Sequence, residues 1–248
     1  MKLAIVTGTS RGIGAAVARE LLERDWRVMG CARGPAASEL NGERYQHRVL
    51  DLSDTQAVEG WFEGEFAAAS GIAQAERVGL VNNAAVVGTA LVRDLDLKEV
   101  ARALTVNVAL PVWLAGLVLR LAPDCPVRVV DISSGAATSA VPGWATYCAS
   151  KAALHMSGEV LVRELEEARA LAGRDLRVVS YAPNVVATAM QEELRALSVE
   201  CFPRRELFVD LEREGRLVDA AGPAREIARL LEDDGLPLHS TLRFLPGA

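Results

Sequence analysis

The sequence lacks the positive charge and the repetition that mark several large classes of protein. Its 248 residues include 33 acidic and 27 basic side chains, which gives a formal net charge of −6. Because a nucleic-acid surface needs clustered positive charge, we expect no nucleic-acid partner. There is no repeat and no low-complexity tract, and the mild acidity is typical of a cytoplasmic protein.

Cysteine and histidine are also scarce. None of the cysteines forms a C-x-x-C pair, and no histidine has a metal-ligand spacing relative to them. We therefore expect no metal site, and we expect reduced thiols in or near the core of a cytoplasmic protein. The residues are Cys31, Cys125, Cys148 and Cys201, with His47, His155 and His239.

Long hydrophobic runs are absent as well. Met1-Lys2 is followed by an apolar run of residues 3–6 only, which is too short for a secretory signal. No window reaches the roughly 18 apolar residues of a membrane helix. The nearest, 103–119, contains Asn107 and Pro111 and predicts a buried helix. We expect no membrane partner.

Short apolar runs alternate with longer helical patterns. Several strand candidates are rich in Val, Ile and Leu without alternation, which is typical of strands covered on both faces. Such alternation predicts βαβ units and an α/β fold, a Rossmann-type doubly wound parallel sheet of about seven strands with helices on both faces. The strands are expected at 2–7, 27–32, 46–50, 78–82, 127–132, 176–181 and, weakly, 241–244, and the helices at about 12–24, 54–69, 97–121, 145–171 and 223–232.

Half of the residues are hydrophobic, enough for one sizeable core, and no linker interrupts the chain. We therefore expect a single domain, 1–248. The stretch from about 189 to 221 departs from the alternation because it is charged, contains Pro203 and has no clear strand. It is either a lid over a substrate cleft or a plain pair of surface helices.

The first strand ends in a glycine-rich turn, residues 7–14 (TGTSRGIG), and a helical pattern follows. Glycines there let the backbone approach a pyrophosphate, whose charge the helix N-terminus meets. The spacing is G-x-x-x-G-x-G rather than the general G-x-G-x-x-G. The predicted cofactor-binding residues of this turn are Gly8, Ser10, Arg11, Gly12, Ile13 and Gly14.

The end of the second strand predicts which cofactor binds. An acid there would accept from the ribose 2′-hydroxyl of NAD, whereas a base would pair with the 2′-phosphate of NADP. The strand ends at Arg33, no acid follows until Glu39, and Arg11 lies in the glycine turn. Guanidinium groups suit phosphate, so we expect NADP(H), unless Arg33 is only a solvated loop charge.

Asp51 and Leu52 follow the third strand and are expected to flank the adenine. Asp51 is also a candidate N-terminal cap of the next helix, a role compatible with the first.

Tyr147 and Lys151 are four residues apart on an expected helix, which puts them on one face. A phenol has a pKa of about 10 and is a poor acid–base catalyst at neutral pH. A neighbouring ammonium would stabilise the phenolate and lower that pKa. Ser134, just after a strand, could hold a carbonyl oxygen beside the tyrosine. Asn107 is either a further site residue or a satisfied core amide.

Together these motifs resemble those of the short-chain dehydrogenase/reductase family over essentially the full length. The glycine turn is residues 7–14, the N-N-A-G turn is 82–85, the tetrad is Asn107, Ser134, Tyr147 and Lys151, and the P-G-x-V-x-T segment is 183–188. The resemblance implies a sheet of order 3-2-1-4-5-6-7. It also implies dimers or tetramers formed through the helices at about 97–121 and 145–171.

The resemblance assigns roles as well. Tyr147 would protonate the carbonyl oxygen while hydride passes from the nicotinamide, and Lys151 would bind the ribose and lower the tyrosine pKa. Ser134 would orient the carbonyl, and Asn107 would support a water. Further cofactor contacts are implied for Asn83, Ala84, Pro183, Val186 and Thr188.

Two positions depart from the motifs. Ala85 replaces the last glycine of N-N-A-G, where its methyl could crowd the cofactor slightly. Asn184 replaces the glycine after Pro183. Asn is common at positive φ among non-glycine residues, so we expect that turn to survive.

Within the family the chain is most similar to sepiapterin reductases and bacterial benzil reductases, which implies a vicinal dicarbonyl substrate. The implied substrate residues are Ser134, Trp144, Tyr147, Met190 and Arg243. Sepiapterin reductases resemble this chain to the last strand, where an aspartate anchors the pterin and this sequence has Arg243. A cation cannot accept from a pterin's N–H groups, so an aromatic or acidic dicarbonyl is at least as good a candidate, unless this register is off by one or two residues.

Two other functions remain open. A non-catalytic NADP(H)-binding sensor on the same fold is the alternative to an NADPH-dependent carbonyl reductase, although the tetrad is intact. An epimerase or dehydratase of the extended branch would carry a T-G-x-x-G-x-x-G turn, which residues 7–14 do not have.

Overall fold

The computed structural model describes residues 1–122 and 124–246, and its centre is one parallel sheet. Seven strands lie in the order β3-β2-β1-β4-β5-β6-β7, which confirms the expected order. Each neighbouring pair is parallel. The strands are β1 Lys2–Thr7, β2 Arg27–Ala32, β3 Tyr45–Val49, β4 Arg77–Asn82, β5 Val127–Ile132, β6 Leu176–Ala182 and β7 His239–Arg243.

Burial explains which strands were easy to predict. Every residue of β5 is buried, because helices cover both faces of the central strands, so aliphatic side chains dominate its sequence, VRVVDI. β7 lies at the sheet edge and is half-buried or exposed throughout. Its apolar signal is correspondingly weak, and it begins at His239 rather than at 241.

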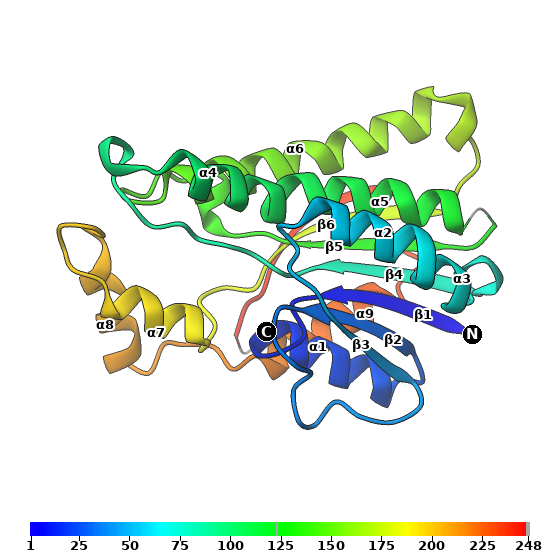
Figure 1. Cartoon of the computed structure of the whole chain (residues 1–248), viewed down its shortest axis with the longest axis horizontal. Helices are drawn as coiled ribbons and strands as arrows, with labels where there is room; N and C mark the ends of the chain where they lie inside the picture. The colour runs from blue at the N-terminus through cyan, green and yellow to red at the C-terminus, as the bar shows by residue number, and fades with distance from the viewer. Residues whose placement is uncertain (123, 247–248) are drawn as a thin grey trace.

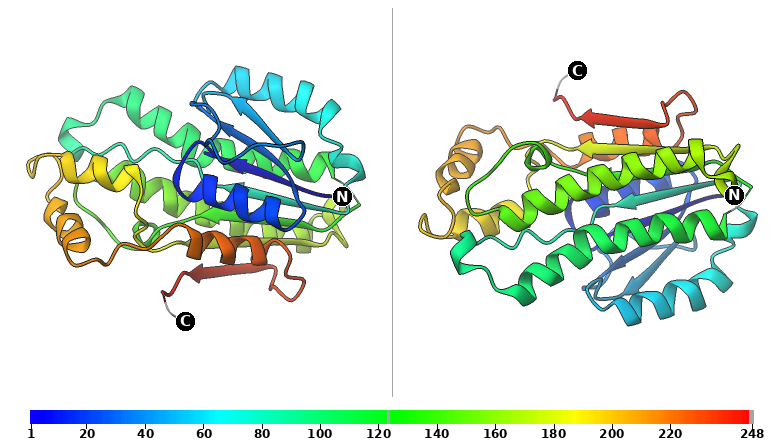
Figure 2. Two further views of the ribbon diagram at one scale, coloured as in Figure 1. Left: turned by 90° about the horizontal axis from the view of Figure 1, so that it is seen from below. Right: turned by 90° about the horizontal axis from the view of Figure 1, so that it is seen from above.

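Helices cover both faces of the sheet, as expected (Figures 1 and 2). One face carries α1 and α9, and the other carries α2, α4, α5 and α6. The helices are α1 Gly12–Glu23, α2 Thr55–Gly60, α3 Ala67–Ala69, α4 Leu97–Leu104, α5 Leu110–Leu121, α6 Ala145–Glu167, α7 Ala189–Ala196, α8 Arg205–Arg213 and α9 Ala221–Leu230. α6 is shorter than the expected 145–171, because it ends at Glu167, Ala168 has extended backbone, and a short 3₁₀ turn, Arg169–Leu171, follows.

The expected helix 97–121 is continuous but not uniform. A π-helical turn, Thr105–Ala109, separates α4 from α5 and contains Asn107. Such turns are frequent at functional sites. By length and composition Leu97–Leu121 could cross a membrane, but half of its most apolar window is buried inside the molecule, which agrees with the expected buried helix.

The segment 189–221 contains α7 and α8, which project beyond the sheet at the end away from the N-terminus (Figure 1). An aromatic cluster joins this segment to the start of α6. The rings of Trp144 and Phe202 are stacked with centroids 5.3 Å apart, and Phe208 lies 5.5 Å from Trp144. The pair of helices therefore packs against the residues that precede Tyr147.

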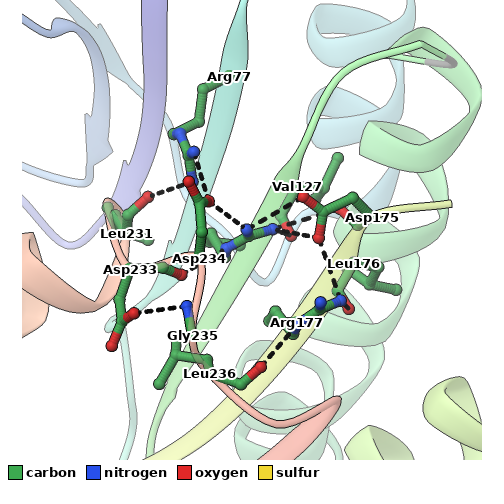
Figure 3. A network of polar contacts seen from close by, with 11 residues as sticks. Arg77, Val127, Asp175, Leu176, Arg177, Leu231, Asp233, Asp234, Gly235 and Leu236 are labelled. Atoms are coloured by element: carbon green, nitrogen blue, oxygen red, sulfur yellow. Dashed lines mark hydrogen bonds and ion pairs between the residues drawn. The ribbon is translucent and has the colours of Figure 1, made fainter.

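An ion network centred on one buried arginine lies at the opposite end of the sheet. The guanidinium of Arg128, 1% exposed, pairs with Asp175 at 3.0 Å and with Asp234 at 2.8 Å. Arg77 also pairs with Asp234, and Arg177 with Asp175 (Figure 3). The network joins the loops that precede β6 and β7, far from the carboxyl ends of the strands.

The cysteines are distributed differently from expectation in one respect. Cys31 is buried and Cys125 and Cys148 are half-buried, whereas Cys201 is exposed. The expectation that all four lie in or near the core is wrong for Cys201, because it lies in the projecting segment. No group of three metal-ligating side chains occurs among the described residues.

Candidate active site

A cleft of about 970 Å³ opens at the carboxyl ends of the strands. The order of the sheet reverses between β1 and β4, and ligands of open α/β sheets bind at such a switch point. All the predicted substrate residues and all but one of the predicted cofactor residues line this cleft. The exceptions among the site residues are Gly14 and Asn107.

The glycine turn has the geometry expected of a pyrophosphate cradle. Gly8 and Gly12 have φ values of 76° and 60°, which favour glycine. A Cβ on Gly14 would lie 2.3 Å from the Gly8 carbonyl oxygen. Gly14 therefore lets α1 pack closely on the turn, and it does not itself line the cleft, so its contact with a cofactor stays a prediction.

Asn83 braces this turn from the end of β4. Its Nδ2 donates to the Thr7 carbonyl oxygen at 2.8 Å, and its backbone N–H donates to Thr7 Oγ1 at 3.0 Å. A Cβ on Gly8 would lie 2.8 Å from the same Nδ2. Asn83 and Ala84 both line the cleft, so the residue that braces the turn also faces the cavity.

Arg33 lies at one end of the cleft, is exposed, and has no hydrogen bond or ion pair within the described chain. The loop that follows it is held by His47, whose Nε2 is 2.9 Å from the Gly34 carbonyl oxygen. His47 Nδ1 is in turn 2.9 Å from the Tyr45 hydroxyl. Sequence reasoning missed His47, since only the register of β2 against β3 brings it near this loop.

Asp51 and Leu52 line the same end of the cleft. Asp51 Oδ1 accepts from the Ser53 backbone N–H at 2.9 Å and from its hydroxyl at 2.8 Å. These bonds hold the pKa of Asp51 below its usual range. The helix cap proposed for Asp51 is wrong: Asp54 caps α2, accepting from Ala57 N–H at 3.0 Å.

Tyr147 and Lys151 lie one turn apart at the start of α6, both buried. Burial raises the pKa of Tyr147 to about 12, opposed by hydrogen bonding to Ser134. The expected lowering of this pKa by Lys151 does not occur here. The ammonium is 5.5 Å from the tyrosine ring centroid and donates to the Ile132 carbonyl oxygen at 2.7 Å, so desolvation of the phenol dominates.

Lys151 belongs to a buried polar cluster that sequence reasoning missed. Burial lowers its pKa to about 8, opposed by the carboxyl of Asp131. Asp131 is 5% exposed, and burial raises its pKa to about 6. Asn82 Nδ2 donates to Asp131 Oδ1 at 2.7 Å, while Asn82 Oδ1 is buried without a partner. The sequence did hold one sign of this cluster, because Asp131 is an acidic residue within a strand that is mostly aliphatic.

Asn107 braces the site from behind the cleft. Its Oδ1 accepts from Val86 N–H at 2.8 Å, and its Nδ2 donates to the Val86 carbonyl oxygen at 2.7 Å and to Ser150 Oγ at 3.0 Å. Both amide N–H groups are thus used. The side chain is a satisfied buried amide that connects the loop after β4 to α6, two elements of the site.

Ser134 lies where β5 gives way to a 3₁₀ turn, with extended backbone. Its Oγ accepts from the Ala136 N–H at 3.2 Å, which leaves the hydroxyl proton free to donate. Ser134, half-buried in the cleft wall, and Tyr147 therefore form one polar patch.

The wall beyond this patch is mostly apolar. Trp144 and Met190 line it as expected, and Val141 and Phe208 were missed because they come from segments without a motif. Arg243 at the end of β7 is the cation of this wall.

The two departures from the motifs are tolerated. Asn184 has a φ of 67°, which confirms that asparagine supports the turn after Pro183. Ala85 lines the cleft and is not among the residues with positive φ.

Comparison with known proteins agrees with this geometry. A family model described as short chain dehydrogenase matches residues 2–198. The chain is 30% identical to a benzil reductase ((S)-benzoin forming) of Bacillus cereus, over 98% of this chain and 99% of that protein. It is 32% identical to the sepiapterin reductase of Bos taurus, over 94% and 90%. The crystal structure of the KRED1-Pglu enzyme superposes with a TM-score of 0.78 at 27% identity, covering 96% of this chain and 97% of that one.

Proposed function

The chain belongs to the short chain dehydrogenase family, and we propose that within it the protein is an NADPH-dependent carbonyl reductase acting on a vicinal dicarbonyl. Membership makes it an oxidoreductase of that family. The observation that supports the finer proposal is the cleft itself. One wall bears the Ser134–Tyr147 patch, and the far end bears the unpaired Arg33.

The cofactor, when bound, supplies the hydride that reduces the carbonyl carbon. Gly8 and Gly12 would admit its pyrophosphate, and Val186 and Thr188, which line the cleft after β6, would hold the carboxamide. Arg33 would pair with the 2′-phosphate of the adenosine ribose. That pairing is the reason for proposing NADPH rather than NADH.

Side chains of the protein would orient the carbonyl oxygen of the substrate and give it a proton. Ser134 donates to it and orients it, and Tyr147 gives it a proton. At neutral pH the high pKa of Tyr147 keeps the phenol protonated, and Lys151 keeps its charge below pH 8. A lysine ammonium would bind the nicotinamide ribose and balance negative charge that develops on the oxygen.

The proposed substrate class comes from the relatives and from the wall. The relatives are named for reduction of benzil and of sepiapterin. Trp144, Met190 and Phe208 form an apolar surface that suits an aromatic body. Arg243 argues against a pterin ring, because a guanidinium offers no acceptor for its N–H groups.

Three further features are proposed with this function. The helices α7 and α8 would act as a lid, since Met190, Gln191 and Phe208 belong to the cleft wall. Exposed apolar side chains on the helical stretch 97–121 and on α6 would form a homodimer or homotetramer interface. They include Leu97 at 81% and Met156 at 55% exposure. The protein would act in the cytoplasm.

The test is NADPH oxidation followed by absorbance, with benzil, sepiapterin and no substrate, and with NADH in parallel. We expect turnover of benzil and a clear preference for NADPH. Tyr147→Phe should nearly abolish turnover and leave NADPH binding intact, measured by cofactor fluorescence. Binding of NADPH without oxidation in any arm would favour the sensor, and equal efficiency with both cofactors would refute the role of Arg33.

A further inference from the structure

Some cationic side chains of the cleft make hydrogen bonds or ion pairs within the protein, and others make none among the described residues. Within the part of the chain that the structure describes, Arg33 and Arg243 have no hydrogen bond and no ion pair from their side chains, although both line the cleft. They lie at its opposite ends. The engaged cations are Arg11 with Glu193 at 3.2 Å, Arg102 with Glu99 at 3.1 Å and Lys151 with the Ile132 carbonyl oxygen at 2.7 Å.

Arg243 lies close to the reacting patch. It is the last residue of β7 and pairs in register with Ala182 of β6. Its Nη2 is 3.3 Å from the position that a Cβ on Gly135 would take. Gly135 directly follows Ser134, and consecutive Cα atoms are about 3.8 Å apart. The guanidinium therefore lies beside the turn that carries Ser134, one residue along the chain from it.

Among the residues that the structure describes, the cleft wall offers Arg243 no anionic partner. Asp51 is the only acid among the described lining residues, and it belongs to the adenosine end beside Arg33. The substrate end combines this cation with an apolar surface. Arg243 itself is exposed and free to turn toward a ligand in the cleft. Charge-assisted hydrogen bonds are stronger than neutral ones, and the fork of an arginine matches the two oxygens of a carboxylate.

We propose that Arg243 binds a carboxylate of the substrate, so that the protein reduces keto acids with an aryl or similarly bulky apolar body. The proposal rests on the carbonyl reductase function and narrows its substrate class. An arylglyoxylate meets both requirements, since it is a vicinal dicarbonyl in which one carbonyl belongs to an ionised carboxylate. A longer keto acid tests the distance from Ser134 to Arg243.

Acid–ester pairs isolate the charge. We would measure kcat and KM with NADPH for phenylglyoxylate and its methyl ester, and for 3-benzoylpropionate and its methyl ester. Each pair shares its aryl ketone, so the acid:ester ratio of kcat/KM reports recognition of the carboxylate. In Arg243→Gln this ratio should fall by about 10- to 100-fold for at least one pair, mainly through the KM of the acid. Arg243→Lys should retain part of the ratio, because it keeps the charge but not the fork.

The matched control is Arg225→Gln, which removes an exposed arginine of α9 that does not line the cleft. It should leave the ratio unchanged. Added salt should raise the KM of the acid in the wild type more than in Arg243→Gln.

The outcomes separate this proposal from the general one. If benzil and the esters are reduced with NADPH but the acid:ester ratio is the same in wild type and Arg243→Gln, the carboxylate site is refuted and the reductase stands. If no carbonyl compound is reduced while NADPH binds, the proposed function itself fails. NADPH binding and a cooperative thermal melt would show that Arg243→Gln is folded. If Arg243→Gln does not fold, the acid:ester ratio is compared between the wild type and Arg243→Lys instead.

Discussion

Asp131→Asn should stabilise the protein at neutral pH and do little at acid pH. Asp131 is buried in β5, and its carboxyl titrates near 6 in the folded protein instead of 3.8. Asparagine has the same shape and no charge. Its amide could also donate to Asn82 Oδ1, which is buried without a partner.

The size of the effect comes from that shift. A rise of about two pKa units corresponds to about 3 kcal/mol. Because the folded pKa is raised, the protonated form is favoured by folding, so wild-type stability is highest below the unfolded pKa of 3.8 and is lost as pH rises through 6. The attraction of Lys151 is already included in this pKa. In a chain of this length about 3 kcal/mol corresponds to roughly 6–12 °C in Tm.

The assay is a series of thermal melts of both proteins from pH 4 to pH 7.5. The Tm of Asp131→Asn should exceed that of the wild type by a margin that opens between pH 4 and pH 6 and then stays constant. A margin independent of pH would show that Asp131 does not titrate in this range. A lower Tm for the variant at pH 7.5 would show that attraction to Lys151 outweighs the burial of the carboxylate.

The same variant tests the link to catalysis. Asp131 raises the pKa of Lys151 against the lowering effect of burial. Its removal should therefore move the alkaline limb of the kcat/KM profile to lower pH. A merely structural role for Asp131 would change the amplitude of the profile but not its position.

Three further results are expected. Wild-type kcat/KM should decline as pH rises through about 8, because Lys151 then loses its charge, measured by initial rates at saturating NADPH. His47→Phe removes the bond to the Gly34 carbonyl and should raise the KM for NADPH by about 10-fold with little change in kcat or in the KM for NADH. Arg128→Met should lower the free energy of unfolding by about 1–3 kcal/mol, measured in urea. The loss is modest because Asp175 is half-exposed and keeps Arg177.

The sequence was sufficient for the central strands because they are short, mostly apolar runs buried between helices. The edge strands β3 and β7 are more polar because they are less buried. It was sufficient for most of the cleft residues that belong to contiguous motifs, such as Gly8 and residues 10–13 of the glycine turn. It could not show which buried polar groups meet. Asn107 bonds to Ser150 across 43 residues, and His47 reaches Gly34 only through strand register.

Sequence motifs did not show where Gly14 and Phe208 lie, and the physical reason is the same for both residues. Gly14 looked like a cofactor residue because it completes the motif, but its place is fixed by the close approach of α1 to Gly8. Phe208 lies in a segment with no strand and no motif, and it reaches the cleft only because the aromatic cluster draws α8 toward Trp144. Contiguous motifs indicate the chemistry of the site. The residues that form the rest of the cleft wall are brought there by packing between segments far apart in the sequence.

The protonation states of the site also bear on the proposed role of Tyr147. Burial raises the pKa of Tyr147 to about 12 and lowers that of Lys151 to about 8. At neutral pH the phenol therefore holds a proton and the ammonium holds a charge, which are the states that reduction of a ketone requires. Oxidation of an alcohol would begin by removing a proton to a Tyr147 phenolate, a form that the apolar surroundings oppose. At neutral pH Tyr147 is therefore a proton donor rather than an acceptor, which is the role proposed for it in the reduction of a ketone.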